Sequence, residues 1–449
     1  MNVKILFDGT NCCDLNTQAQ LTVAGSSPYL LQGLFKFFRR EAPNIKTVNL
    51  AFFIFNNKLL HDELNRLALE FDIEINVISI PLEGYDHQKR ANVYDLTGIT
   101  VLRTGVTKKE LAAEVYDEFT ESTVHEKYKL FIFPHIYVRS KSMKFFSRGA
   151  LPYSLHIKSI HVVFRDDCRS SVMLSSSNFA VRDQTKSEFL VRVDDDQAIS
   201  DSSRQFFELL ISNSIPVKKF TENFDSFKFN INKFLTQSIA TNANLFGAPF
   251  LKNSQVKIKS RIIDLIINTK RRLYISAQHL SAFQKPQVAS KGKPFDYPNQ
   301  ILNYALDLPS EIEVHFLSQT FVDEFGNSHG CNRPENESAF KDFIGACVKK
   351  GRTSYFANKV IHWKFIVSDD IVVLTTCNFT PTQFIYIEDV RINRFDSHPE
   401  LSYFGIHSEV GQFLIFENSD IAAELIAEFE KCSFLKDTVS LDKILAARW

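Results

Sequence analysis

A pattern of His, Lys, Asn and Glu occurs twice in this chain, in the same order. The first copy is LHIKSIHVVFRDDCRSSVMLSSSNF, followed by KSEFLVRVDDD and an amphipathic segment. The second copy is IHWKFIVSDDIVVLTTCNFT, followed by HSEVGQFLIFENSD and another amphipathic segment. Each copy predicts a strand, a polar turn, a second strand ending near Asn, a third strand after Glu, and a helix. An internal duplication is the simplest explanation, so we expect two related halves.

The rest of each half alternates short apolar runs of strand length with segments whose apolar residues recur at helical spacing. Strands are expected at 3–7, 48–55, 74–80, 272–280 and 311–318, and helices at 28–40, 58–71, 108–119, 259–272, 299–308 and 337–351. The last of these helices should stop at Gly351. Such alternation predicts the α/β class, with a mixed or parallel sheet covered by helices in each half. We place the halves at residues 1–240 and 241–449, joined by a polar segment near 240–253.

Composition limits the functions that this chain can have. Its 52 Lys and Arg residues balance 52 Asp and Glu residues, so binding to a polyanion would need a local basic patch. No stretch reaches the roughly 18 to 20 uninterrupted apolar residues of a membrane span, and the N-terminus reads as a strand rather than a signal peptide. The 7 cysteines are scattered, with no CxxC pair, which predicts reduced thiols and no zinc site. We therefore expect a cytoplasmic protein without stable membrane association.

Each copy of the pattern supplies an imidazole, an ammonium, a carboxamide and a carboxylate. These residues are His156, Lys158, Asn178 and Glu188 in the first copy and His362, Lys364, Asn378 and Glu409 in the second. In a strand, His and Lys separated by one residue point to the same face. A neutral imidazole can attack phosphorus near neutral pH, and a protonated one can give its proton to a leaving oxygen. Lys and Asn can hold the nonbridging oxygens, and a carboxylate behind each imidazole would fix its tautomer. The set therefore predicts cleavage of a phosphodiester.

His161 is an alternative to His156, because it also lies shortly before Asn178. No Lys follows His161 at the required interval, so we prefer His156.

The two copies resemble the repeated motifs of the phospholipase D superfamily. In the second copy, HWKFIVSD places Asp369 at the family's interval after Lys364, and TTCNFT stands where the family has Gly-Ser-x-Asn. In the first copy, Val163 stands where the acidic residue would fall, and the long hairpin resembles the tyrosyl-DNA phosphodiesterase branch. The resemblance implies two phospholipase D-like α/β/α halves that form one pseudo-two-fold active site.

The resemblance also implies a covalent phosphohistidine mechanism that uses no metal or other cofactor. By analogy, His156 is the nucleophile, while His362 is first the general acid and then the base that activates water. Asp369 would belong to the same site.

Basic and aromatic residues precede both motifs, in an arrangement suited to phosphates and bases. The basic residues are Arg139, Lys141 and Lys144 before the first motif, and Lys349, Lys350 and Arg352 before the second. They favour a nuclease acting on DNA in preference to RNA, related to restriction or host defence. A phospholipid hydrolase or transferase is one alternative, and a decayed nucleic-acid-binding module is another. Because both motifs lie in one chain, a dimer is not required to build the site. The sequence does not decide whether the protein forms a homodimer or binds a defence-system partner.

Overall fold

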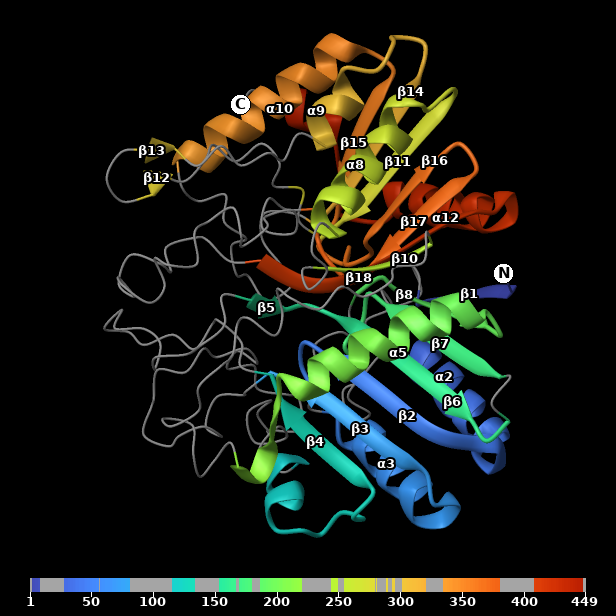
Figure 1. The fold of residues 1–449 in the computed structure, drawn as a ribbon. Coiled ribbons are helices and arrows are strands. Elements are labelled where there is room, and N and C mark those ends of the chain that lie inside the picture. The colour runs from blue at the N-terminus through green and yellow to red at the C-terminus, as the bar shows by residue number, and fades with distance from the viewer. Residues whose placement is uncertain are drawn as a thin grey trace.

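The computed structural model describes residues 2–8, 28–55, 57–80, 115–133, 153–166, 169–179, 186–219, 244–248, 254–278, 280, 288–289, 293–294, 301–319, 334–379 and 408–446. The expected join of the halves at 240/241 lies outside these ranges. Figure 1 shows two sheets, one built from the N-terminal part of the chain and one from the C-terminal part.

The first sheet has eight strands, with a parallel centre and antiparallel flanks. In spatial order they are β1 (Asn2–Asp8), β8 (Glu188–Asp194), β7 (Ser170–Ser175), β6 (Lys158–Phe164), β2 (Ile45–Phe52), β3 (Glu74–Ser79), β4 (Tyr128–Ile132) and β9 (Ile215–Pro216). Strands β2, β3 and β4 run parallel, whereas β6, β7, β8 and β1 continue the sheet in antiparallel pairs.

Eight of the nine strands of the second sheet repeat this arrangement, and the ninth, β5 (Tyr153–Leu155), pairs with β18. In spatial order these eight strands are β10 (Leu245–Ala248), β18 (Ser408–Glu417), β17 (Ile371–Thr375), β16 (Phe365–Ser368), β11 (Arg272–Ala277), β14 (Glu313–Ser318), β15 (Thr353–Ala357) and β19 (Val439–Ser440). Here β11, β14 and β15 are the parallel centre, and β16, β17, β18 and β10 are the antiparallel flank. The match of order and direction confirms the predicted fold class.

Both halves contain helices beside their sheet. The described helices are α2 (Pro28–Glu41), α3 (Lys58–Phe71) and α5 (Gln197–Ser212) in the first half, and α8 (Ser254–Ile267), α9 (Ile301–Leu306), α10 (Pro334–Lys350), α12 (Ser419–Ser433) and α13 (Leu441–Ala446) in the second. On β6, His161 contacts Ser200 of α5. The opposite face of β6 carries Phe164, which lines a cavity together with Phe37 of α2. Because successive side chains of a strand point to opposite faces, helices cover both sides of the sheet.

Most expected elements are confirmed, with ends that differ by a few residues. Of the helix expected over 108–119, residues 108–114 lie outside the described ranges and residues 115–119 are helical. The helix expected over 259–272 ends at Ile267, and Arg272 already begins β11. The carboxylate of Asp369 accepts hydrogen bonds from the backbone N–H groups of Lys270, Arg271 and Arg272, which fixes these residues in a turn. Gly351 has a φ of 68° directly after α10, as a glycine that ends a helix should.

The two sheets share part of one core. Each half has its own cluster of buried apolar side chains. A third cluster combines Val172 and Leu174 of β7 with residues of β16, β17, β18 and α12. Trp363, which separates His362 from Lys364, is fully buried in this cluster and contacts the ring of Phe7 on β1, with a 6.2 Å centroid distance. The position of the second motif therefore depends on packing against the first half.

Candidate active site at the junction of the two halves

The repeated residues lie where the strand ends of the two sheets meet. Residues 360–361 run beside Ser187 at the start of β8, in a parallel bridge. In the mirrored position, β5 (Tyr153–Leu155) runs parallel to the start of β18, and the N–H of His156 donates to the carbonyl of Val410 at 2.9 Å. Each histidine thus lies beside the start of a strand in the opposite sheet, His362 near β8 and His156 near β18.

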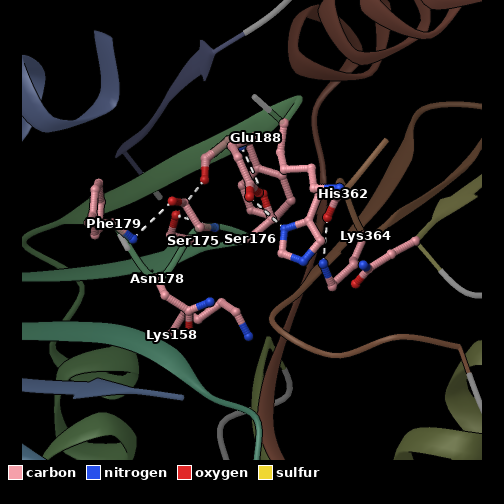
Figure 2. Close-up of polar contacts among 12 residues, drawn as sticks. Lys158, Ser175, Ser176, Asn178, Phe179, Glu188, His362 and Lys364 are labelled. Carbon is pink, nitrogen blue, oxygen red and sulfur yellow. Dashed lines mark hydrogen bonds and ion pairs between the residues drawn. The ribbon is translucent and has the colours of Figure 1, made fainter. Parts of the chain in front are cut away.

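This crossing pairs each imidazole with a carboxylate from the other half. His362 Nδ1 lies 2.5 Å from Glu188 Oε1, and both side chains are buried, with 4% and 0% exposed. Figure 2 shows the ring of His362 directed at Glu188. His156 Nδ1 lies 3.7 Å from Glu409 Oε2, and each of these side chains is 14% exposed. In both rings the carboxylate lies beside Nδ1. Nε2 is therefore the ring nitrogen that is suited to react with a substrate.

The two lysines are buried beside their own histidines. Lys158 Nζ donates to the carbonyl of His156 at 3.0 Å and to the carbonyl of Thr376, in the other half, at 3.4 Å. Lys364 Nζ donates to the carbonyl of His362 at 2.5 Å. Neither lysine has measurable exposure. Lys158 opens β6, whereas Lys364 precedes β16, so the prediction that both His-x-Lys pairs lie within strands was wrong. Both histidines lie outside the strands, and backbone contacts with the other half, at Ser187 and Val410, hold the segments that carry them.

The asparagines follow β7 and β17 and are almost fully buried. Asn178 Oδ1 accepts from the backbone N–H of Ile54 at 3.4 Å. Hydroxyl groups set the backbone before each asparagine. The N–H of Ser177 donates to Ser175 Oγ at 3.0 Å, and the N–H of Cys377 donates to Thr375 Oγ1 at 3.1 Å. The small hydroxyl residues of each copy therefore shape the turn that carries Asn, which Figure 2 shows for Ser175, Ser176 and Asn178.

Charge in this cluster suits a phosphodiester. Two buried ammonium groups balance two carboxylates when both imidazoles are neutral. When one imidazole is protonated, the cluster carries one net positive charge, equal and opposite to the single charge of a diester. A site of low dielectric constant amplifies that attraction.

Asp369 is not brought to this cluster. It lies in the turn after β16, at the opposite end of that strand from His362, with a φ of 54°. Its carboxylate accepts hydrogen bonds from the N–H groups of the two residues before β11 and of its first residue, at 2.8 to 3.2 Å. In the first half the matching turn position is Arg165, not Val163. The N–H of Arg165 donates to the carbonyl of Asn44 just before β2, as that of Asp369 does to the carbonyl of Arg272 at the start of β11.

The basic residues of the second cluster are also remote from the histidines. Lys350 Nζ donates to the carbonyls of Pro309 and Ile312, and Arg352 donates to the carbonyl of Glu311. These contacts lie at the starts of β14 and β15, whereas the histidines lie beyond the end of the parallel strand β11. Lys349 lies in the last turn of α10, before Lys350. The first cluster, Arg139, Lys141 and Lys144, lies outside the described residues.

His161 is excluded as the motif histidine. It lies within β6, has no measurable exposure, and contacts Ser200 Oγ through Nε2 at 3.0 Å. Burial lowers the pKa of His161 to about 4, so it is neutral at physiological pH.

Two residues near His156 were missed from the sequence. Phe53, directly after β2, contacts the ring of His156 edge-on at 5.3 Å. Nothing in its sequence context distinguishes it from a core aromatic residue. Cys377 Sγ lies near both His156 and Glu409. Its position beside Asn378 in the motif was the available signal.

Comparison with known proteins bears on the fold. No protein-family model and no curated protein matches the sequence. Among solved structures, phosphatidylserine synthase from Haemophilus influenzae Rd KW20 is similar over 97% of this chain and 87% of its own, with a TM-score of 0.57 and 12% identity. The fold is phospholipase D-like.

Two further structures are similar at lower scores. Yeast tyrosyl-DNA phosphodiesterase has a TM-score of 0.40 and 12% identity, with 83% of each chain covered. Nuc from Salmonella typhimurium, described as a phospholipase D family member, has a TM-score of 0.25 and 12% identity, covering 42% of this chain and 91% of its own.

The described residues contain no helix that is both long and apolar enough to cross a membrane. Within the same residues, Cys347, Cys377 and Cys432 are buried free thiols.

Proposed function

We propose that this protein is a metal-independent phosphodiesterase that cleaves nucleic acid, DNA in particular, through a phosphohistidine intermediate. The observation that carries this proposal is the reciprocal pairing of His362 with Glu188 and of His156 with Glu409. Two imidazoles with carboxylates on Nδ1 can divide the roles of nucleophile and acid in a two-step displacement.

In the first step, Nε2 of one imidazole attacks phosphorus, and the other imidazolium gives its Nε2 proton to the leaving oxygen. In the second step, the imidazole that gave its proton takes one from water, and the resulting hydroxide breaks the phosphorus–nitrogen bond. Lys158 and Lys364 place positive charge beside the reacting group throughout. Transition-state charge of this kind is mainly stabilised by such fixed cations.

The difference between the two pairs supports His156 as the nucleophile and His362 as the acid. A fully buried carboxylate at 2.5 Å stabilises the imidazolium form of His362. The carboxylate of Glu409 lies farther from His156, and both groups are partly exposed, so the neutral, nucleophilic form of His156 is disfavoured less.

Nucleic acid is supported by the sequence. Arg139, Lys141 and Lys144 precede His156 together with Phe145 and Phe146, a composition suited to phosphates and bases. The net charge of zero limits such binding to a local patch. A restriction-like or host-defence nuclease is the role that fits best.

A second candidate is transfer or hydrolysis of a phospholipid headgroup. The similarity to phosphatidylserine synthase, which spans nearly the whole chain, favours it. The same two-histidine chemistry would serve, with an alcohol or water as the second-step acceptor. A decayed binding module is disfavoured, because both His–Glu pairs are intact even though the turn of the first motif has Arg165 instead of an acidic residue.

The test is turnover in EDTA on plasmid DNA, single-stranded DNA, RNA and phospholipid vesicles. Wild type is compared with His156→Ala, His362→Ala and the control His125→Ala, which removes a histidine remote from the site. We expect metal-free cleavage of DNA, lost in both site variants and kept in the control. Turnover of vesicles alone would favour the lipid candidate, and no turnover on any diester would refute the enzyme.

Trapping separates the roles of the two histidines. With end-labelled DNA and acid-free quenching, His362→Ala should slowly form a covalent adduct without turning over. The first step loses its acid but keeps its nucleophile, whereas the second step loses its base. Accumulation in His156→Ala instead would reverse the assignment.

A further inference from the structure

Three side chains of different metal-ligand types meet behind His156, on the side of its Nδ1 atom. They are His156, Cys377 and Glu409, whose ligand atoms all lie within 4.8 Å of one another. His156 Nδ1 and Glu409 Oε2 are 3.7 Å apart. Tetrahedral zinc with bonds of about 2.0–2.3 Å holds its ligand atoms roughly 3.3–3.8 Å apart. The three atoms would therefore need to approach one another by about 1.5 Å or less to bind one ion.

We propose that His156, Cys377 and Glu409 bind a thiophilic divalent cation such as zinc, and that its binding inactivates the site. The binding itself needs only these three side chains, whereas the inactivation rests on the proposed function. The chemistry differs from metal-dependent catalysis, because the ion takes the ring nitrogen opposite to the reacting one.

The backbone holds the thiol in place. Gly411 on β18 lies so close to Cys377 that a Cβ atom there would overlap Sγ. Only a glycine at that position lets the thiol lie against the strand that carries Glu409. The N–H of Cys377 also donates to Thr375 Oγ1 at 3.1 Å, which fixes the turn. Two of the three ligands, Cys377 and Glu409, are therefore held in place by neighbouring segments of the second half.

The other histidine lacks this set. Ser177 takes the place of Cys377 in the first-half turn, with the same N–H contact to a hydroxyl two residues earlier. His362 Nδ1 and Glu188 Oε1 are already in direct contact at 2.5 Å, which leaves no room for an ion between them. Of the two motif histidines, only His156 combines a nearby carboxylate with a soft sulfur ligand.

A second group of metal-ligand residues, His61, Asp62 and Glu118, carries no such inference. Lys58 Nζ forms ion pairs with both carboxylates of this group, Asp62 and Glu118. The lysine ammonium therefore already neutralises the charge that a metal ion would need.

The ion would reach the group from the surface. The side chains of His156 and Glu409 are each 14% exposed, whereas Cys377 is deeper and fully buried. Zinc binds cysteine as the thiolate, so the thiol proton is released to solvent. Solvent water would complete the coordination at the exposed side, as in zinc sites with three protein ligands.

Binding removes the nucleophile. An imidazole with a metal on Nδ1 carries its remaining proton on Nε2, so Nε2 has no lone pair with which to attack phosphorus. In the metal-free site, Glu409 lies beside His156 Nδ1. With the ion bound, Glu409 would coordinate the metal and would no longer interact with the imidazole.

The first test measures hydrolysis of bis(p-nitrophenyl) phosphate by EDTA-stripped full-length protein in buffered zinc. We expect zinc to inhibit wild type, and Cys377→Ser to raise the half-inhibiting concentration about tenfold or more, because a hydroxyl is a poor zinc ligand. Cys347→Ser removes a buried thiol of the second-half core and is the matched control, with wild-type sensitivity. Magnesium, a hard cation, should have no effect. Equal zinc sensitivity in wild type and Cys377→Ser would overturn the proposal.

The second test does not depend on turnover. Cobalt(II) replaces zinc, and its thiolate charge-transfer absorption is compared between wild type, Cys377→Ser and His156→Ala. A band that is lost in both variants and kept in Cys347→Ser supports the site even if no diester is cleaved. An active enzyme with identical cobalt spectra in all four proteins refutes the metal site while leaving the proposed function intact.

Discussion

At the scale of single residues, the candidate active site depends on contacts that neither half can make alone. The imidazole of His362 comes from the second half and its carboxylate, Glu188, from the first, while His156 and Glu409 reverse this arrangement. The sequence supplied all eight residues of the two copies. It did not show which carboxylate serves which histidine, because that choice depends on how the halves dock.

Glu188→Gln should be the more damaging of the two carboxylate changes. The amide oxygen of Gln can still accept a hydrogen bond from His362 Nδ1–H. The substitution removes the buried negative charge that stabilises the imidazolium. We expect kcat to fall roughly 10²- to 10⁴-fold without loss of the fold. Glu409→Gln should cost at least about tenfold less, because its pair is longer and partly exposed. Steady-state kinetics on a small diester and circular dichroism test this, and equal losses in the two variants would contradict it.

Gly411→Ala should disturb the protein through Cys377. The added methyl would overlap Sγ of Cys377 and press on Thr376 Oγ1 at 3.0 Å. Overpacking of this kind costs about 1–3 kcal/mol of unfolding free energy. The double variant Gly411→Ala, Cys377→Ala should regain most of that loss, which urea unfolding of the four proteins of the cycle can measure. Additive effects of the two changes would argue against the contact.

At the scale of elements, Asp369 joins two parts of the second sheet. Its carboxylate links the turn between β16 and β17 to the start of β11 and the two residues before it. Sequence interval alone placed it with the catalytic residues, because an interval cannot show to which end of a strand a side chain belongs. The same contact explains why the helix α8 ends before Lys270.

Asp369→Gly should therefore lower stability and leave catalysis unchanged. Glycine tolerates the φ of 54°, so the variant isolates the lost hydrogen bonds. We expect a loss of about 1–3 kcal/mol in unfolding free energy and a kcat within about twofold of wild type. Asp369→Asn, which keeps one acceptor, should lie between the two. A large loss of kcat in a variant that is still folded at the assay temperature would return Asp369 to the site.

His161 ties the stability of the α5–β6 contact to pH. Burial lowers its pKa to about 4 in the folded protein, against about 6.5 when unfolded. The unfolded chain therefore binds the proton first as pH falls, and stability is lost between pH 6.5 and about 4. From pH 7 to pH 5 the loss from this group is about 2 kcal/mol.

The check is the difference between wild type and His161→Phe in urea unfolding at pH 7 and pH 5. The variant keeps a ring against Phe207 but cannot titrate, so its loss on acidification should be smaller by that amount. His61 and His315, whose pKa values burial also lowers, remain in both proteins and cancel. A pH dependence identical to wild type would show that His161 is not held neutral.

At the scale of the whole molecule, the duplication was readable from the sequence, whereas the junction was not. Periodic apolar residues and the repeated motif residues predicted two α/β halves, because both signals are local. The third apolar cluster brings β7 and β8 against β16, β17, β18 and α12, residues far apart in the chain with no local signal of contact. The docking of the halves follows from that shared surface.

Because of this shared cluster, the two halves should unfold as one cooperative unit. Trp363 lies in the second half but packs on Phe7 of the first, so in a Trp449→Phe background its fluorescence reports on the junction. Leu64→Ala on α3 removes a buried side chain of the first-half core, at a cost of about 2–5 kcal/mol. If unfolding is cooperative, the Trp363 transition and the far-ultraviolet circular dichroism transition shift together to lower urea. If the halves unfold independently, the circular dichroism curve splits in two and no longer coincides with the Trp363 transition.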